Sequence, residues 1–235
     1  TGFRDVLELG RRTRPNPYGL IGSFEPLISR EYRLEVDERM DADGNVVTAL
    51  DEDGVRAAAE KLVALGCESL MIHFLHAYAN DSHEKRAAEI AGAVWPNDHI
   101  TYGSAILAEF REYERGVAAA VNAAIQPVLT RYLERLRDEL NNGGYSRDLL
   151  VMQGNGGTVS SAVVAKSAIN TVMSGPASGV MAAAFTGARS GFENIISYDM
   201  GGTSSDVGLI GGGIPAVSSE LQLEYGMPIH VPMVD

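Results

Sequence analysis

The stretch that most restricts the fold is SYDMGGTSSDVGLI (Ser197–Ile210), in which two strand-like runs flank a loop rich in glycine and hydroxyl groups. The first run places Asp199 near its end, Gly201 and Gly202 follow at once, and Asp206 opens the second run. A tight turn between two strands explains the two glycines, but it explains neither the two carboxylates nor the three hydroxyl groups. The pattern therefore predicts a β-hairpin whose loop has a further purpose.

A phosphate group is the ligand that this loop predicts. Glycines let backbone N–H groups turn toward an anion, and Thr203 and Ser204 add hydroxyl donors. A carboxylate such as Asp199 can hold Mg²⁺ through water, and we assign catalytic roles to Asp199 and Asp206. A P-loop or a Rossmann fingerprint would open a helix, whereas this loop opens a strand.

Upstream of the hairpin, strands and helices alternate. Residues 30–50 predict two strands around the turn DADGN, and residues 69–78 predict a strand that is apolar on both faces, as in a central parallel strand. Helices are predicted at residues 51–66 and 80–96, and a further strand at residues 99–106. This β–α–β–α–β order predicts a layered α/β domain with right-handed crossovers.

The second half of the chain continues this alternation. A long helix follows residue 111, and Pro127 is expected to kink it. A strand is predicted at residues 147–152, a short helix at residues 158–170, and a helix of small residues at 174–191.

Two further glycine-rich loops are candidate parts of a site. In QGNGG, Asn155 can point its amide toward a ligand beside Gly156 and Gly157, or the loop can simply cap the helix that is predicted next. In SGPASG, Ser174 and Gly175 can form an anion site at a helix N-terminus with Ser174 as the cap. The small residues there equally suit close packing of two lobes.

Composition excludes several classes of partner. The net charge of −12 disfavours nucleic acid and anionic membranes, and no apolar run approaches the ~20 residues of a membrane span. Cys67 is the only cysteine, so a disulfide framework is excluded and a reducing, cytoplasmic location is expected. We interpret Cys67 as a packing residue. His73 and His76 lie three apart, which does not suit a shared metal on one strand face, and we interpret them as core or supporting residues.

Four stretches together resemble the hydantoinase A and 5-oxoprolinase family. They are DMGGTSSDV, GFRDVLELGRRTRP at the start, FREYERGVAAAVNAAIQPVLTRYLERL in the middle, and VMQGNGG with SGPASGV before the hairpin. Members typically carry EYERT, where this chain has Gly116, and Thr-Ser-Thr-Asp, where this chain has Ser205 in the third position. The resemblance covers essentially the entire chain.

The resemblance implies an α/β, sugar kinase/Hsp70/actin-like two-lobe fold. Residues 1–190 would form part of the first lobe, including an interlobe helix at residues 174–190. Residues 191–235 would begin the second lobe with the phosphate hairpin. The family's first phosphate hairpin and its nucleoside-contacting stretch are expected outside this chain, which would then be a fragment that holds one wall of the site.

The resemblance also implies a reaction. It points to an ATP- and Mg²⁺-dependent hydrolase that opens a cyclic amide of the hydantoin or 5-oxoproline type by phosphorylating the amide oxygen. Arg111 and Glu112, in a charged run that would be a solvated face on most helices, are implied to hold the substrate. A subunit of an acetone- or acetophenone-type carboxylase is one alternative, and an inert nucleotide-binding or structural module is another. A homo-oligomer, or a hetero-oligomer with a hydantoinase B-type subunit, is expected.

Overall fold

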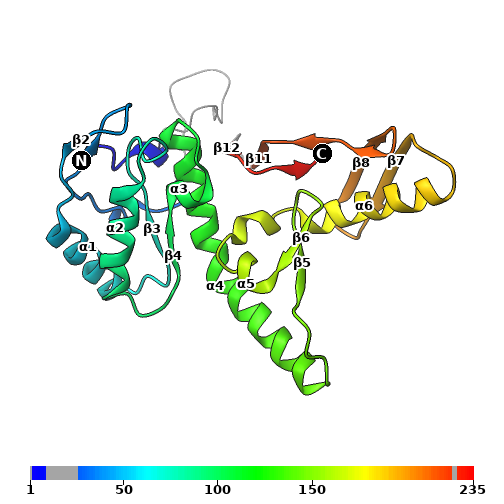
Figure 1. Ribbon diagram of the computed structural model, residues 1–235, viewed down its shortest axis with the longest axis horizontal. Helices are drawn as coiled ribbons and strands as arrows, with labels where there is room; N and C mark the ends of the chain where they lie inside the picture. Colours follow the sequence, from blue (N-terminus) through cyan, green and yellow to red (C-terminus); the bar gives the residue numbers. More distant parts are fainter. Residues whose placement is uncertain (1, 9–25, 224–226) are drawn as a thin grey trace. The chain divides into compact units, whose positions relative to one another are not determined.

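The computed structural model describes residues 2–8, 26–223 and 227–235 (Figure 1), so the opening stretch of the family resemblance continues past Glu8 into residues outside this description. The chain divides into two compact units. Unit 1 comprises Thr1–Val128 and Gln222–His230, and unit 2 comprises Leu129–Leu221 and Val231–Asp235. The division between the units falls at Val128, inside one long helix. The boundary between lobes that the sequence places near residue 190 stays a prediction.

Unit 1 is a three-layer α/β/α arrangement around two parallel strands, as the strand–helix order predicts (Figure 1). Val55, Leu62, Ile72, Ile90 and Trp95 belong to the buried core on one side of this small sheet. On the other side, Thr101 is buried and hydrogen-bonds to Asn122 and Gln126 of the long helix. The elements of these layers are α1 (Glu52–Ala64), β3 (Leu70–Ile72), α2 (Ser82–Gly92), β4 (Ile100–Tyr102) and α4 (Glu112–Asn142).

The expected ends of α1 are confirmed, whereas the expected kink of α4 at Pro127 stays a prediction. The Asp51 carboxylate accepts the backbone N–H of Gly54 at 3.0 Å and so caps α1, and Gly66 follows its end with φ +80°. Pro127 lies inside α4, which continues to Asn142. Short 3₁₀ turns precede these elements at η1 (Val6–Glu8) and η2 (Arg30–Tyr32).

The hairpin predicted around DADGN is present but shorter than expected. It consists of β1 (Arg39–Met40) and β2 (Val46–Thr48), and the Asp41 carboxylate accepts backbone N–H groups within the turn. Leu34 and Val36 lie outside β1, yet both pack on the core of unit 1. The alternation of the sequence therefore predicted burial correctly and strand length wrongly.

The strands predicted at residues 69–78 and 99–106 are also shorter, because side chains take over backbone groups that a ladder would use. Beyond β3, the Phe74 N–H donates to the Glu84 carboxylate at 2.8 Å, and the Phe74 carbonyl accepts from Arg115 at 2.9 Å. Beyond β4, the Ser104 N–H donates to Glu84 at 2.7 Å, and a short helix, α3 (Gly103–Ile106), replaces the expected strand.

After the end of α4, unit 2 continues with a β-hairpin that the sequence reading missed. Thr158 and Val159 belong to a strand that pairs antiparallel with residues 150–152, the part of the predicted strand at 147–152 that forms, and Val151 lies opposite Val159. The predicted helix at residues 158–170 is therefore wrong at its start, where β-branched residues favour the pleated conformation. Only Ser161–Val164 of this range is α-helical, and a 3₁₀ turn follows at Ala168–Thr171. The elements are β5 (Leu150–Met152), β6 (Thr158–Ser160), α5 (Ser161–Val164) and η3 (Ala168–Thr171).

The second part of unit 2 is a helix packed on an antiparallel sheet. Val180 and Ala184 of the helix form a small core with Ile210. A Cβ on Gly208 would lie 2.3 Å from Val180 Cγ2, and one on Gly187 would lie 1.9 Å from an Ile195 side-chain carbon, so these glycines permit the close approach. The elements are α6 (Ser174–Arg189), β7 (Ile195–Met200), β8 (Ser205–Gly211) and β9 (Ile214–Pro215), in sheet order β7-β8-β9.

The remaining strands form two short pairs. They are β10 (Val217–Ser218) with β13 (Met233–Val234), and β11 (Leu221–Leu223) with β12 (Met227–Ile229). In the part of the chain that the structure describes, no helix is both long and apolar enough to cross a membrane.

Candidate functional site

The glycine motif forms the hairpin that the sequence predicts, with a loop longer than a two-residue turn. Strands β7 and β8 pair antiparallel from Ile195 opposite Ile210 to Met200 opposite Ser205. The loop Gly201–Ser204 joins them, and the Gly201 N–H donates to the Ser204 carbonyl at 3.0 Å. Thr203 and Ser204 are exposed, so their hydroxyl groups are available to a ligand.

The two glycines of this loop have no structural requirement within the described chain. Neither Gly201 nor Gly202 has a positive φ. A Cβ on Gly202 would meet nothing within 4 Å, and one on Gly201 would be 3.6 Å from the Ser204 carbonyl oxygen, an ordinary contact. These positions therefore leave room for a ligand to approach the backbone closely.

Asp199 and Asp206 lie directly opposite each other on β7 and β8. Opposite residues of an antiparallel pair share one face, so the two carboxylates are neighbours and like charges there are unfavourable. This face looks toward α6, because a Cβ on Gly179 would be 3.8 Å from Asp199 Oδ2. Both carboxylates line a pocket of about 340 Å³ between α6 and the sheet, together with Pro176 and Val180.

Two carboxylates are enough protein ligands for Mg²⁺, but too few for a metal ion that is held by side chains alone. Mg²⁺ usually binds through one or two carboxylates, with water and phosphate oxygens filling the other positions. Outside the segments that the structure leaves undescribed, no group of three or more His, Cys, Asp or Glu side chains is arranged to hold a metal ion. Asp199 and Asp206 could supply two of the oxygen ligands of such a cation.

The start of α6 differs from its predicted cap. Met173, with φ 59° and ψ 18°, is the N-cap residue, and Ser174 is already the first residue of the helix. The Ser174 carbonyl accepts the Ser178 hydroxyl at 2.6 Å. The predicted capping role of Ser174 is wrong because the left-handed backbone at Met173 begins the helix one residue earlier. Gly175 lies one turn before Gly179, on the helix face that meets the carboxylates.

The QGNGG loop is the turn between β5 and β6. The Asn155 side-chain oxygen accepts the Gly157 N–H at 2.8 Å, so this oxygen stabilises the turn. A Cβ on Gly156 would lie 2.8 Å from Met181 Sδ, which places the loop against α6. Since Met181 and Gly179 are two residues apart, they point to roughly opposite sides of α6. A direct role of Asn155, Gly156 and Gly157 beside the carboxylates stays a prediction without support from this geometry.

Arg111 and Glu112 lie in unit 1, at the start of α4. Arg111 has φ 79°, a conformation that a non-glycine residue adopts at some cost and that is common at functional sites. Its guanidinium is exposed and lies 4.0 Å from Glu114. Glu112 lines a pocket in unit 1. The two proposed substrate residues are thus adjacent, and only Glu112 reaches that pocket.

Behind them lies a buried charged pair that the sequence reading missed. Glu84 and Arg115 are both 0% exposed. Arg115 donates to the carbonyls of Glu109 and Phe74, both at 2.9 Å, while Glu84 accepts the N–H groups of Phe74 and Ser104. Together they hold the loops after β3 and β4 against the start of α4.

Burial governs the titration of this pair. It raises the pKa of Glu84, against the lowering effects of the backbone N–H groups and of Arg115, and it lowers the pKa of the Arg115 guanidinium. The charged run at residues 109–115 is therefore not simply a solvated face. The signal that could have revealed the pair is a charged residue on an apolar helix stripe, because Glu84 precedes Ala87 and Ala91 at positions i+3 and i+7.

Comparison with known proteins identifies the family. The chain matches the model described as Hydantoinase/oxoprolinase over residues 115–235, and the model of the Hydantoinase/oxoprolinase N-terminal region over residues 1–95. The chain belongs to the hydantoinase/oxoprolinase family. The resemblance seen in the sequence motifs is thereby confirmed.

Relatives within the family cover the full chain. An uncharacterised protein of Methanocaldococcus jannaschii is 35% identical over 100% of this chain and 36% of its own length. Caprolactamase subunit alpha of Pseudomonas jessenii is 30% identical over 97% of this chain and 34% of its own length.

Solved structures confirm the fold of the hydantoinase/oxoprolinase family for this chain. The ATP-dependent caprolactamase of Pseudomonas jessenii has a TM-score of 0.85 at 30% identity, and a nucleotide-free acetone carboxylase has 0.83 at 27%. Each match covers 100% of this chain and 34% of the other chain. The chain therefore spans about a third of the length of the relatives that it matches.

Proposed function

We propose that this chain is the nucleotide-binding part of an ATP-dependent enzyme that opens a cyclic amide. The observation that carries the proposal is the hairpin loop, whose two glycines are required neither by φ nor by packing and which lies beside two opposed carboxylates. The loop would present backbone N–H groups and the hydroxyls of Thr203 and Ser204 to phosphate oxygens. The ATP-dependent caprolactamase and the acetone carboxylase of the family support this assignment.

Asp199 and Asp206 would hold Mg²⁺ together with the phosphates. When bound, Mg²⁺ would neutralise charge on the phosphate oxygens. In the actin-like two-lobe arrangement that we propose, this hairpin is one wall of the nucleotide site, and a longer polypeptide supplies the other.

ATP would act as a substrate that activates the amide. Transfer of its γ-phosphoryl group to the amide oxygen would release ADP and activate the amide carbon. Water would add to that carbon, and cleavage of the C–N bond would open the ring to an acyl phosphate and a free amine. A second water would hydrolyse the acyl phosphate to the carboxylate and phosphate. Donors placed around the phosphates contribute most when charge moves during the transfer.

A carboxylase subunit is the second candidate, because the structural match to acetone carboxylase is nearly as close as the match to caprolactamase. The relative named subunit alpha is part of a multi-subunit enzyme. We therefore expect this protein to assemble with a second type of subunit, of the hydantoinase B kind, or with copies of itself. A cytoplasmic location stays our expectation.

The test uses the intact protein that contains this chain. ATP hydrolysis is measured with ε-caprolactam, hydantoin and 5-oxoproline, and separately with acetone and bicarbonate. We expect an amide to stimulate ATP hydrolysis, and Asp199→Ala to remove most of that turnover without unfolding the protein. Asp98→Ala, which removes an exposed carboxylate distant in sequence from Asp199, is the matched control. Wild-type turnover in Asp199→Ala would contradict the metal and phosphate role, and stimulation by acetone with bicarbonate alone would favour the carboxylase.

A further inference from the structure

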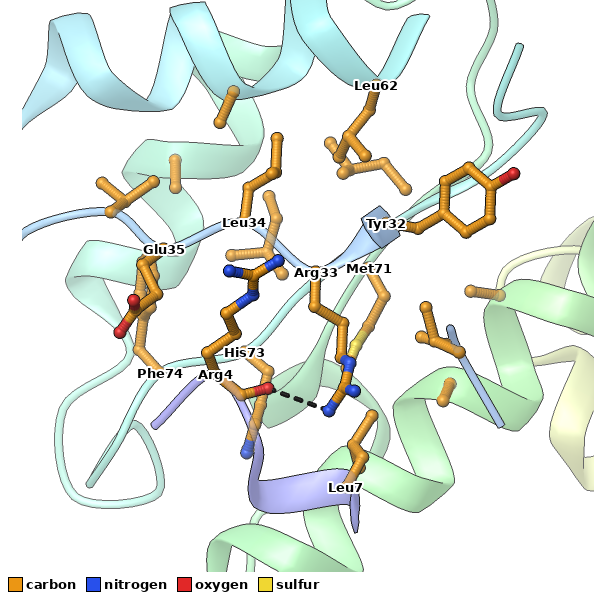
Figure 2. Close-up of a pocket in the computed structure, with 18 of the residues that line it drawn as sticks. Arg4, Leu7, Tyr32, Arg33, Leu34, Glu35, Leu62, Met71, His73 and Phe74 are labelled. Carbon is orange, nitrogen blue, oxygen red and sulfur yellow. Dashed lines mark hydrogen bonds between the residues drawn. The ribbon is translucent and has the colours of Figure 1, made fainter. Parts of the chain in front are cut away.

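Unit 1 contains a pocket of about 630 Å³ that the hairpin chemistry does not use. The pocket follows β3, because every residue from Cys67 to Leu75 lines it, whereas none of the described residues of β4 does. Figure 2 shows Leu62 of α1, Met71 of β3 and Leu7 of η1 among the residues that line it. The pocket therefore lies along the edge of β3 that is turned away from β4.

This edge of β3 offers backbone groups to another strand. In the described part of the chain, β3 pairs with β4 alone. The Leu70 N–H donates to the His99 carbonyl at 2.9 Å, on the side of β4. Successive residues of a strand direct their backbone groups to alternate edges, so the N–H and carbonyl of Met71 are directed toward the pocket. Such an edge is a template for pairing with a further strand.

Helices of both layers line the pocket with small or apolar side chains. Val55, Ala58 and Leu62 come from α1 on one side of the sheet, and Ala120 and Ala124 come from α4 on the other side. A strand of a parallel sheet that is enclosed between two helical layers makes apolar contacts on both of its faces. The lining and the free edge of β3 together have the properties of a site for one more strand.

The buried charges in the lining do not require a charged ligand. Arg33 and Glu38 are the buried charged residues among the described residues that line the pocket. Arg33 forms an ion pair with Glu8, and the Glu38 carboxylate lies 2.9 Å from His83 Nδ1. Because protein groups already pair with both residues, an uncharged and apolar segment is compatible with this lining.

The first described residues indicate the direction of such a strand. Phe3 and Leu7 line the pocket. A Cβ on Gly116 would lie 3.1 Å from Leu7 Cδ2 and 3.3 Å from His73 Cδ2, so Leu7 lies beside the residue that follows β3. A strand that leads into Phe3 would therefore finish at the same end of the sheet as β3, and the two strands would be parallel. The connection between them contains α1, as a crossover between parallel strands usually contains a helix.

We propose that a β-strand of the intact polypeptide, from outside residues 1–235 and leading into Phe3, fills this pocket and pairs in parallel with β3. The relatives provide the length for it, since the chain spans 36% and 34% of the two curated relatives described above. The strand would be apolar on both faces, and its backbone would pair with that of Met71. The pocket is then an interface between two parts of one polypeptide, and this assignment does not depend on which reaction the enzyme catalyses.

Hydrogen exchange of the intact protein, resolved to single amides, tests the pairing. We expect the Met71 N–H to exchange as slowly as the Leu70 N–H, which is bonded on the side of β4. Fast exchange at Met71 beside slow exchange at Leu70 would mean that the edge is open and would overturn the inference. Protection of Met71 that is lost when the protein is diluted would assign the edge to a second copy, and this result would overturn it too.

Ala124→Leu tests independently whether the pocket is filled. Ala124 lines the pocket and is exposed in the described fold. With a strand in the pocket, the larger side chain overpacks it and should lower the thermal midpoint of the intact protein by roughly 2–10 °C. Ala57→Leu, at an exposed position of α1 that is not part of the described lining, is the control and should leave the midpoint nearly unchanged.

The opposite result of this substitution is equally informative. An unchanged or raised midpoint in Ala124→Leu would mean that leucine finds open space, and it would overturn the inference in favour of a pocket that is free for a small ligand. The exchange measurement uses the unaltered protein, so it decides the matter even where the variant does not fold.

Discussion

The buried charges of unit 1 and the exposed loop of unit 2 are opposite solutions for polar side chains. Glu84 and Arg115 are enclosed, and each makes two hydrogen bonds to backbone groups of neighbouring loops. Asp199 lies at an exposed strand end, faces a second carboxylate, and has beside it glycines that contact little. Contacts within the protein explain why Glu84 and Arg115 are charged residues. For Asp199 and the neighbouring glycines, the protein offers no such contacts, and we propose that a ligand supplies them.

This difference teaches how to separate structural from functional polar residues in the chain. A polar residue that holds the fold has its hydrogen-bonding groups filled by protein, so its removal should cost stability. A polar or glycine residue that serves a ligand has those groups open, so its change should cost binding and leave the fold nearly intact. Three substitutions test this division, and they differ in the size of the expected effect on folding.

Glu84→Ala should have the largest effect on folding. It leaves two backbone N–H groups, of Phe74 and Ser104, without their acceptor and removes the negative charge near buried Arg115. Removing one member of a buried charged arrangement costs about 3–5 kcal/mol. Denaturant unfolding of the intact protein measures this loss. Glu89→Ala, on the exposed side of the same helix, is the control and should change stability by less than ~0.5 kcal/mol. Equal stability of the two variants would contradict the comparison.

The same contrast explains which parts of the fold were predictable. Periodicity placed α1, α2 and α4 and the parallel pair of strands, because apolar burial dictates those elements and is visible in the sequence. It overestimated β3 and β4, because Glu84 and Arg115 take the backbone groups of Phe74 and Ser104 by contacts distant in sequence. No local pattern encodes such contacts.

The candidate site divides in the same way. The hairpin with Asp199, Asp206 and its glycines was predictable because the motif is continuous and its register follows from strand pairing. The capping role of Ser174 was wrong because the left-handed backbone at Met173 was invisible to sequence reasoning. His73 was interpreted as a core or supporting residue, and its ring packs against Gly103 and Gly116, which come close to it only in the folded chain.

Gly208→Ala should have an intermediate effect and shows that a glycine in unit 2 can also be structural. Its Cβ would lie 2.3 Å from Val180 Cγ2 and 2.8 Å from Ser197 Oγ, so α6 would have to move from the sheet. Overpacking of this kind costs about 1–3 kcal/mol. Gly211→Ala on the same strand meets nothing within 4 Å and is the matched control. Thermal unfolding measures both variants. Equal midpoints for Gly208→Ala and Gly211→Ala would show that α6 does not pack as closely as described.

Gly202→Ala should have the smallest effect on folding and a clear effect on nucleotide binding. Its φ is not positive and a Cβ there would meet nothing within 4 Å, so we expect the unfolding free energy to change by less than ~0.5 kcal/mol. If the loop lies against phosphate, the added methyl group would separate the backbone from the ligand at a cost of about 1–3 kcal/mol, or about tenfold to a hundredfold in the dissociation constant of ATP with Mg²⁺. Gly211→Ala, equally open but at the other end of β8, should leave both quantities unchanged. Titration calorimetry on the intact protein gives the affinity, and denaturant unfolding gives the stability. Full ATP affinity in Gly202→Ala would mean that the open space around this loop is not where the phosphates bind.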